Sequence, residues 1–183
     1  MNSHPIQIGE VHRDLKIVNL GSVSVALLNL LGDTELTEAA ASALVDKLPQ
    51  GVDVLVAPEV KAVPLAHAMS AKTGIPYVVV RKTQKPYMIG SKKKTVVSIT
   101  TGKPQDLVID GEDIGRLQGK NVAIVDDVVS TGNTLRALLE LLAELQATAI
   151  ATMAVFTEGS PRDDIIALGH LPLFDGSEGV SAL

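Results

Sequence analysis

The sequence has no cysteine, no tryptophan and only two phenylalanines and two tyrosines. Without cysteine the chain has no disulfide framework, no thiolate metal site and no cysteine nucleophile, and this composition is in keeping with a reducing cytoplasm. Long hydrophobic runs are absent too, because charged residues or glycine interrupt each apolar stretch before it reaches the length of a membrane span. The first ten residues lack the basic flank and apolar run of a signal peptide. We therefore expect a cytoplasmic protein with no membrane partner.

Positive charge is in the minority, since 16 lysines and arginines face 21 aspartates and glutamates, for a net charge of -5. A chain with this balance has no general affinity for nucleic acid, so a nucleic-acid partner is not expected. An anionic ligand would need a local concentration of donors. The 183 residues are 46% hydrophobic, which suits a single domain, 1–183, with a sizeable core.

Short apolar runs alternate with segments of helical spacing along the chain. The runs are rich in β-branched residues and predict strands that are covered on both faces. They span residues 52–57, 77–80, 121–125 and 149–156. Helical spacing is found over residues 35–48, 62–72 and 134–145. The alternation predicts an α/β fold with a mainly parallel twisted sheet flanked by helices, whose ligands bind at the carboxyl ends of the strands.

Two regions fall outside this alternation, residues 1–34 and residues 83–119. The second is polar, and a connection of its length is uncommon unless it is a functional loop or carries its own hairpin. We expect a long flexible loop or hairpin over the site. Its three consecutive lysines, Lys92, Lys93 and Lys94, are interpreted as a solvated basic tip that could also bring charge to a closed site.

The strongest chemical signal lies at the end of the third predicted strand, where Asp126 and Asp127 are adjacent. Carboxylates in this place can accept hydrogen bonds from two neighbouring sugar hydroxyls. The segment 130–134 reads Ser-Thr-Gly-Asn-Thr and leads into a helix, where free N–H groups and the helix dipole favour a phosphate. A second interpretation stays open, in which the acids are a solvated strand end and Ser130 or Thr131 caps the helix.

This motif resembles the phosphoribosyl-diphosphate signature of the type I phosphoribosyltransferases, and it fits neither the Walker A nor the dinucleotide glycine pattern. The resemblance implies an enzyme that transfers the 5-phosphoribosyl group of phosphoribosyl diphosphate to a purine base, with a small hood formed by residues 1–34. It gives catalytic roles to Asp126 and Asp127, which would hold the ribose hydroxyls. The residues that would cradle the 5′-phosphate are Val128, Val129, Ser130, Thr131, Gly132, Asn133 and Thr134.

Two further loops extend the resemblance. The segment after the first predicted strand stands where the family has its diphosphate-binding loop, and it consists of Glu59, Val60, Lys61 and Ala62. The segment after the second strand is similar to a basic run of adenine phosphoribosyltransferases, and its cations are Arg81, Lys82 and Lys85. The resemblance implies that these cations and Lys61 stabilise the departing diphosphate, with Lys82 among the catalytic residues.

The resemblance also implies a cofactor and a partner chain. Mg²⁺ is expected to arrive with the substrate, near Asp126 and Asp127, because it prefers phosphate oxygens and water to an all-protein cage. Similar enzymes are usually homodimers, and the apolar residues of Val23 to Leu31 could serve either an interface or the core. A different function also stays open, that of a non-catalytic regulator that senses phosphoribosyl diphosphate or a nucleotide with the same pocket.

The acceptor base is left open between adenine and hypoxanthine or guanine. Ser130 stands where the common hypoxanthine-guanine enzymes have an aspartate, and Thr100 stands where adenine enzymes have a glutamate in the long loop. The stretch around Thr100 is similar to that of archaeal-type hypoxanthine enzymes. Phe156 is a candidate for stacking on the base, although it could equally be a core residue.

Overall fold

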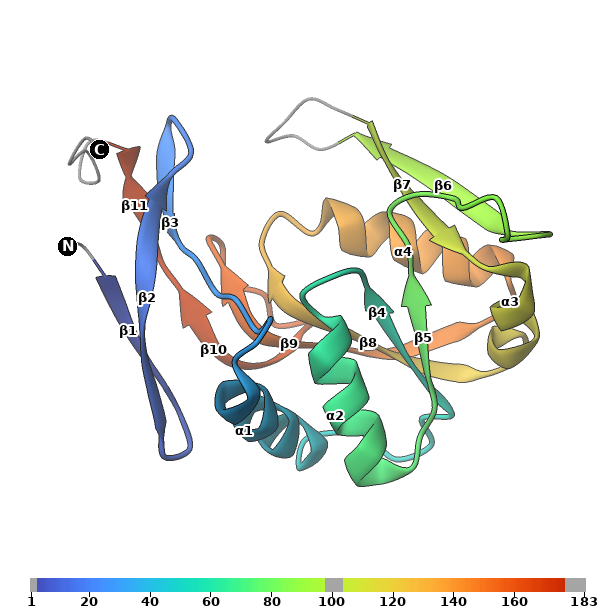
Figure 1. Ribbon diagram of the computed structural model, residues 1–183, viewed down its shortest axis with the longest axis horizontal. Helices are drawn as coiled ribbons and strands as arrows, with labels where there is room; N and C mark the ends of the chain where they lie inside the picture. The colour runs from blue at the N-terminus through green and yellow to red at the C-terminus, as the bar shows by residue number, and fades with distance from the viewer. Residues whose placement is uncertain (1–2, 98–103, 177–183) are drawn as a thin grey trace.

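A computed structural model of the chain describes residues 3–97 and 104–176. A five-stranded parallel sheet occupies its centre, and four helices cover the two faces of this sheet (Figure 1). The strand order is β10 (Ile166–Leu171), β9 (Thr148–Glu158), β8 (Asn121–Val129), β4 (Val54–Pro58) and β5 (Tyr77–Val80). The strands and the parallel pairing that the apolar runs predicted are thus confirmed.

The helices lie in two layers because successive side chains of a strand point to opposite faces of the sheet. Val125 of β8 belongs to the apolar cluster under α1 (Thr34–Val45) and α2 (Val63–Thr73). Its neighbour Ile124 belongs to the cluster on the other face, under α3 (Gly111–Leu117) and α4 (Asn133–Glu144). Within the described part of the chain, none of the helices is both long enough and apolar enough to cross a membrane.

A second, antiparallel sheet stands at one side of the central sheet (Figure 1). Its strands, in spatial order, are β1 (Ser3–Ile8), β2 (Val11–Asn19), β3 (Val23–Ala26) and β11 (Leu173–Asp175). Arg13 of β2 fastens this hood to α1, because its guanidinium binds Asp33 at 2.7 and 2.9 Å and Glu35 at 2.7 Å. Asp33 also caps α1 by accepting a hydrogen bond from the Leu36 N–H at 3.1 Å.

The segment 83–119 carries its own hairpin, made of β6 (Lys92–Val97) and β7 (Pro104–Ile109), followed by α3. The lysine run is not at the tip of this hairpin. Lys92, Lys93 and Lys94 begin β6, and Lys94 binds two glutamates of α4, Glu140 at 2.7 Å and Glu144 at 3.0 Å. Lys92 and Lys93 are exposed, as expected, whereas the placement of the run at a tip was wrong and Lys94 ties the hairpin to α4.

Candidate active site

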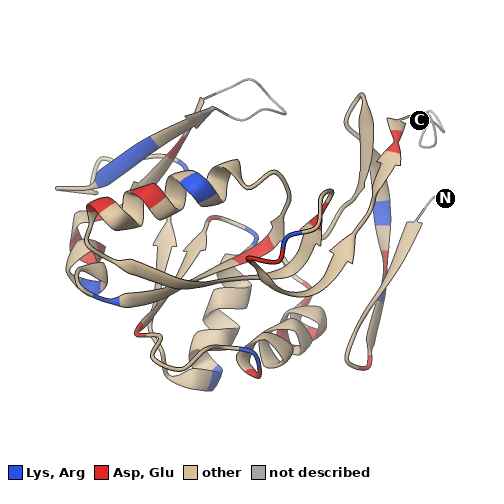
Figure 2. Cartoon of the chain, turned by 180° about the vertical axis from the view of Figure 1, so that it is seen from behind, with Lys and Arg blue, Asp and Glu red and all other residues tan. Residues whose placement is uncertain are grey.

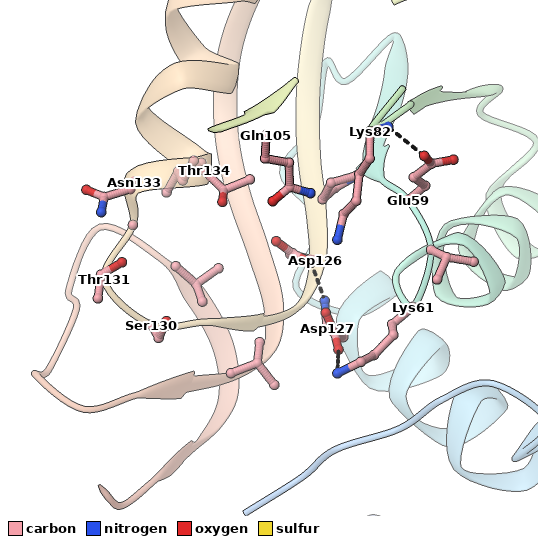
Figure 3. A pocket seen from close by; sticks show the side chains of 16 residues that line it. Glu59, Lys61, Lys82, Gln105, Asp126, Asp127, Ser130, Thr131, Asn133 and Thr134 are labelled. Atoms are coloured by element: carbon pink, nitrogen blue, oxygen red, sulfur yellow. Dashed lines mark hydrogen bonds and ion pairs between the residues drawn. The ribbon is translucent and has the colours of Figure 1, made fainter. Parts of the chain in front are cut away.

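A cavity of about 280 Å³ opens at the carboxyl ends of β4, β5 and β8 (Figure 3). This is the edge at which a parallel sheet is expected to bind ligands. Residues from four separate segments of the sequence line it. They are Pro58, Glu59, Val60, Lys61, Lys82, Gln105, Asp126, Asp127, Val128, Val129, Ser130, Thr131, Gly132, Asn133, Thr134 and Leu135.

The two adjacent acids lie on the floor of this cavity, at the end of β8 (Figure 3). The N–H of Asp127 donates a hydrogen bond to Oδ1 of Asp126 at 2.9 Å. Oδ2 of Asp127 is buried, and among the described residues it accepts no hydrogen bond of good geometry. Its nearest cation is the Lys61 ammonium, 3.3 Å away, which also donates to the carbonyl of Leu28 at 3.1 Å. The described residues thus leave part of the hydrogen-bonding capacity of this carboxylate unused.

The carboxyl group of Asp126 is held in an unfavourable environment for a charge. Burial raises its pKa well above 3.8, the neighbouring Asp127 carboxylate adds to the rise, and the nearby Lys82 ammonium opposes it. Asp126 is surrounded by protein atoms but remains partly exposed to the cavity. A ligand that brings hydroxyl donors or positive charge would therefore stabilise the ionised form of this carboxyl group.

We expect Asp126→Asn to raise the free energy of unfolding, and the gain to grow with pH. The pKa of Asp126 is higher in the folded than in the unfolded chain, so its contribution to stability is fully present below the ordinary value of 3.8 and is lost as pH rises through the folded pKa. Urea denaturation at about pH 4 and about pH 8 measures the difference between variant and wild type. An equal difference at both pH values would contradict the assignment.

The start of α4 is built to leave its hydrogen-bonding groups available. Gly132 is the N-cap residue, in the left-handed conformation with φ 77°, and among the described residues no side chain caps the helix. The interpretation in which Ser130 or Thr131 merely caps the helix is therefore wrong. The unpaired N–H groups of the first turn and the hydroxyls of Ser130, Thr131 and Thr134 line the same cavity. Such an end binds an anion well.

Glu59 joins the two loops that follow β4 and β5. Its carboxylate accepts hydrogen bonds from Nε of Arg81 at 2.6 Å and from the N–H of Lys82 at 2.5 Å (Figure 3). The pairing with Glu59 raises the pKa of Arg81. Because Glu59 engages Arg81, it is Lys82 that points into the cavity toward Asp126 (Figure 3).

Most residues expected at the site line this cavity, and the exceptions are Ala62, Arg81, Lys85 and Phe156. Ala62 is buried at the start of α2, and Arg81 is paired with Glu59. The structure does not bring Phe156 to the cavity. Its ring is 5% exposed and covers Gly169, where an added Cβ would lie 2.9 Å from the ring. It occupies the room that the glycine leaves, as a core residue. The stretch around Thr100 lies outside the described residues.

Sequence reasoning missed Gln105, which reaches the cavity from β7 (Figure 3). Its place depends on the hairpin, in which it pairs with Val96, and on the docking of that hairpin against α4. The sequence around Gln105 carries no motif that marks it. Glu158 lies at the end of β9, in the segment of Phe156, and had been given no role of its own. Burial raises its pKa, while the charges of Lys61 and His170 lower it.

The oxygen atoms of the site are compatible with a magnesium ion that is bound mainly by phosphates and water. Mg²⁺ takes oxygen ligands and often uses one or two carboxylates together with phosphates and water. Asp126 and Asp127 supply such carboxylates, and Oδ2 of Asp127 is without a hydrogen bond from the described residues. In the same part of the chain, no three His, Asp or Glu side chains gather as a metal-binding group would require. These two acids are therefore the ones that would face a magnesium ion brought in with phosphates.

Comparisons with known proteins give the site a context. A hypoxanthine/guanine phosphoribosyltransferase of Methanosarcina acetivorans is 30% identical over 172 residues, which cover 94% of this chain and 84% of the relative. An orotate phosphoribosyltransferase of Methanopyrus kandleri is 36% identical over 107 residues, 58% of this chain and 47% of the relative, so the match spans about half of that protein.

The fold also has a counterpart among solved structures. The adenine phosphoribosyltransferase of Thermoanaerobacter pseudethanolicus superposes with a TM-score of 0.65 at 23% identity, over 77% of this chain and 84% of that one. The two proteins therefore share their fold. The model of the phosphoribosyl transferase domain family matches residues 31–168, which contain strands β4, β5, β8 and β9 of the central sheet, the acids of β8 and the start of α4. The chain belongs to the phosphoribosyl transferase domain family.

Proposed function

We propose that the chain is a purine phosphoribosyltransferase, which converts a purine base and phosphoribosyl diphosphate into a nucleoside 5′-monophosphate and diphosphate, a reaction of purine salvage. One observation carries the proposal. The paired acids of β8 lie between the uncapped start of α4 on one side and Lys61 and Lys82 on the other, around one cavity (Figure 3). A sugar with a phosphate at one end and a diphosphate at the other fits this order, because each phosphate group would meet an anion-binding end of the cavity and the sugar hydroxyls would meet the acids.

The substrate occupies three subsites on this proposal. The start of α4, residues 130–134, holds the 5′-phosphate with N–H groups and hydroxyls. Asp126 and Asp127 accept hydrogen bonds from the two ribose hydroxyls. Lys61 and Lys82, with the N–H groups of the loop 59–62, face the diphosphate. The 5′-phosphate and ribose subsites are at the end of β8, and the diphosphate subsite is at the ends of β4 and β5, so the sheet fixes the distances between them.

In the reaction, the bond between the anomeric carbon and the diphosphate oxygen breaks, and the electron pair leaves with the diphosphate. A ring nitrogen of the base then gives its lone pair to the same carbon, and the base releases its proton. The sugar passes through an oxocarbenium-like state, and the negative charges of Asp126 and Asp127 lie beside the ribose where this positive charge develops. Lys82 and Lys61 stabilise the negative charge on the departing diphosphate. Mg²⁺, when bound with the substrate, would neutralise further charge on the diphosphate.

A 6-oxopurine is the proposed acceptor. Two relatives named hypoxanthine/guanine phosphoribosyltransferase support this choice. One is the protein of Methanosarcina acetivorans, and the other is that of Methanothermobacter thermautotrophicus, which is 35% identical over 130 residues that cover 63% of its length.

The acceptor is tested by offering adenine, hypoxanthine, guanine, xanthine, uracil and orotate separately, with phosphoribosyl diphosphate and Mg²⁺, and measuring diphosphate release. We expect turnover with hypoxanthine or guanine. Turnover with orotate alone would remove the purine assignment. Failure with every base, with tight binding of phosphoribosyl diphosphate in calorimetry, would favour the regulator that senses this ligand.

The homodimer implied by the resemblance stays a prediction. In the segment 23–31, Leu28 and Leu30 are buried in the core, whereas Leu27 and Leu31 are 44% and 42% exposed. The two exposed side chains are the ones that a second copy would cover.

A further inference from the structure

The loop between β9 and β10 places an arginine against the start of α4. A Cβ added to Gly132 would overlap Nη1 of Arg162, so the guanidinium lies directly on this glycine. Gly132 lines the cavity and begins the helix. The charged residues of the chain are coloured in Figure 2, and the contact of Arg162 with Gly132 places this loop beside the start of α4. Arg162 was not singled out by its sequence, because nothing local marks it.

Arg162 is held in this orientation by its neighbour Asp164. Nε and Nη2 donate to the two carboxylate oxygens at 2.8 and 2.7 Å, in a two-point contact that fixes the plane of the guanidinium. The third nitrogen, Nη1, faces Gly132 and makes no hydrogen bond to the described residues. The side chain of Arg162 is 24% exposed, against 62% for Asp164. The cation is thus the better covered member of the pair.

The sign of this charge is unusual for its place. The amino end of a helix carries a partial positive charge, which favours acidic side chains and disfavours a cation. A covered arginine at this end is unfavourable while the site is empty and favourable once an anion binds to the helix start beside the guanidinium. The contact with Gly132 also limits the movement of the loop whose N–H groups would bind that anion.

We propose that Arg162 is a positioning residue of the 5′-phosphate subsite, which holds Gly132 and the start of α4 in place and adds positive charge to the bound phosphate. The inference rests on the proposed function, because that function assigns the 5′-phosphate to residues 130–134. Asp164 acts with it by fixing the plane of the guanidinium.

The test compares Arg162→Gln with wild type in calorimetric titrations of ribose 5-phosphate and, separately, of diphosphate. The dissociation constant of ribose 5-phosphate is expected to rise about tenfold in the variant, as for the loss of one charge-assisted contact. The dissociation constant of diphosphate should stay unchanged, because Lys61 and Lys82 lie on the other side of the cavity. Arg162→Lys keeps the charge but loses the two-point contact with Asp164, so it should restore part of the affinity.

Arg136→Gln is the matched control, since Arg136 is exposed in the first turn of α4 and approaches Asn133 only at 3.5 Å. It removes the same charge near the same helix end and should leave both affinities unchanged. If both glutamine variants lost the same affinity for ribose 5-phosphate, the effect would come from the general charge near the helix, and the inference would be overturned. An unchanged affinity for ribose 5-phosphate, or a parallel loss for diphosphate, would also overturn it. If the wild type turns over no base, the proposed function fails, whereas the titrations still decide the role of Arg162.

Discussion

Asp127→Asn is expected to lower kcat/KM for phosphoribosyl diphosphate by about 100-fold or more, the range found when one preorganised electrostatic contact is removed from an active site. The side chain of Asp127 lines the cavity and is 14% exposed, and its Oδ2 is 3.3 Å from Lys61, so the negative charge lies where the ribose is proposed to bind. The amide removes the negative charge while keeping the shape. Steady-state diphosphate release measures the loss, and thermal unfolding checks that the variant keeps its fold.

Asp46→Asn serves as the control for this variant. Asp46 lies exposed at the end of α1, so the same change of charge is made away from the cavity. Its kcat/KM should equal that of the wild type. A modest loss shared by both variants would show that Asp127 acts only through the overall charge of the protein, and the ribose assignment would fail.

Lys82→Met should reduce kcat/KM by about 10- to 100-fold, since a hydrogen bond to a charged group contributes about 1.5–3 kcal/mol. Lys82 points into the cavity, and Glu59 fixes its backbone by accepting its N–H at 2.5 Å (Figure 3). The methionine keeps the length of the side chain and removes the charge that would stabilise the departing diphosphate. The same variant should bind diphosphate more weakly in calorimetry and bind ribose 5-phosphate as the wild type does.

Lys47→Met is the matched control, because Lys47 is exposed just after α1 and does not line the cavity. Its kinetics should not change. A Lys82→Met enzyme that loses affinity for ribose 5-phosphate and keeps its affinity for diphosphate would reverse the assignment of the two ends of the cavity.

The central sheet and the acids of β8 could be predicted because their signals are local. A buried parallel strand is a continuous apolar run, and Asp126 and Asp127 interrupt such a run at its end. The start of α4 follows within a few residues, so the ribose and phosphate subsites come from one continuous segment. The loops after β4 and β5 are equally local, since each begins where a predicted strand stops.

The contacts that were missed depend on segments distant in the sequence. The hood is completed by β11, which pairs with β3 across most of the chain length. Gln105 and Arg162 reach the site only because a hairpin docks on α4 and a loop folds over Gly132. Lys94 was assigned to solvent because its two partners, Glu140 and Glu144, are distant from it in the sequence. Composition and periodicity carry no information about such pairs.

Phe156 illustrates a different limit. Its position near the end of β9 suits a residue that faces a ligand, and its ring is one of few aromatic groups in the chain. The direction of the ring is decided by Gly169 on the neighbouring strand β10. This glycine has no side chain, and the ring of Phe156 lies over it. The sequence could thus predict that Phe156 lies near the end of a strand, but the face of the sheet to which its ring points depends on a residue of another strand.

The transfer itself is tested most directly by incubating the protein with phosphoribosyl diphosphate, Mg²⁺ and its preferred purine, and quantifying both products by chromatography. The nucleoside 5′-monophosphate and diphosphate should appear in equal amounts, and both should disappear with Asp127→Asn. Diphosphate without nucleotide, or neither product from the wild type, would contradict the assignment of this cavity as a phosphoribosyltransferase active site.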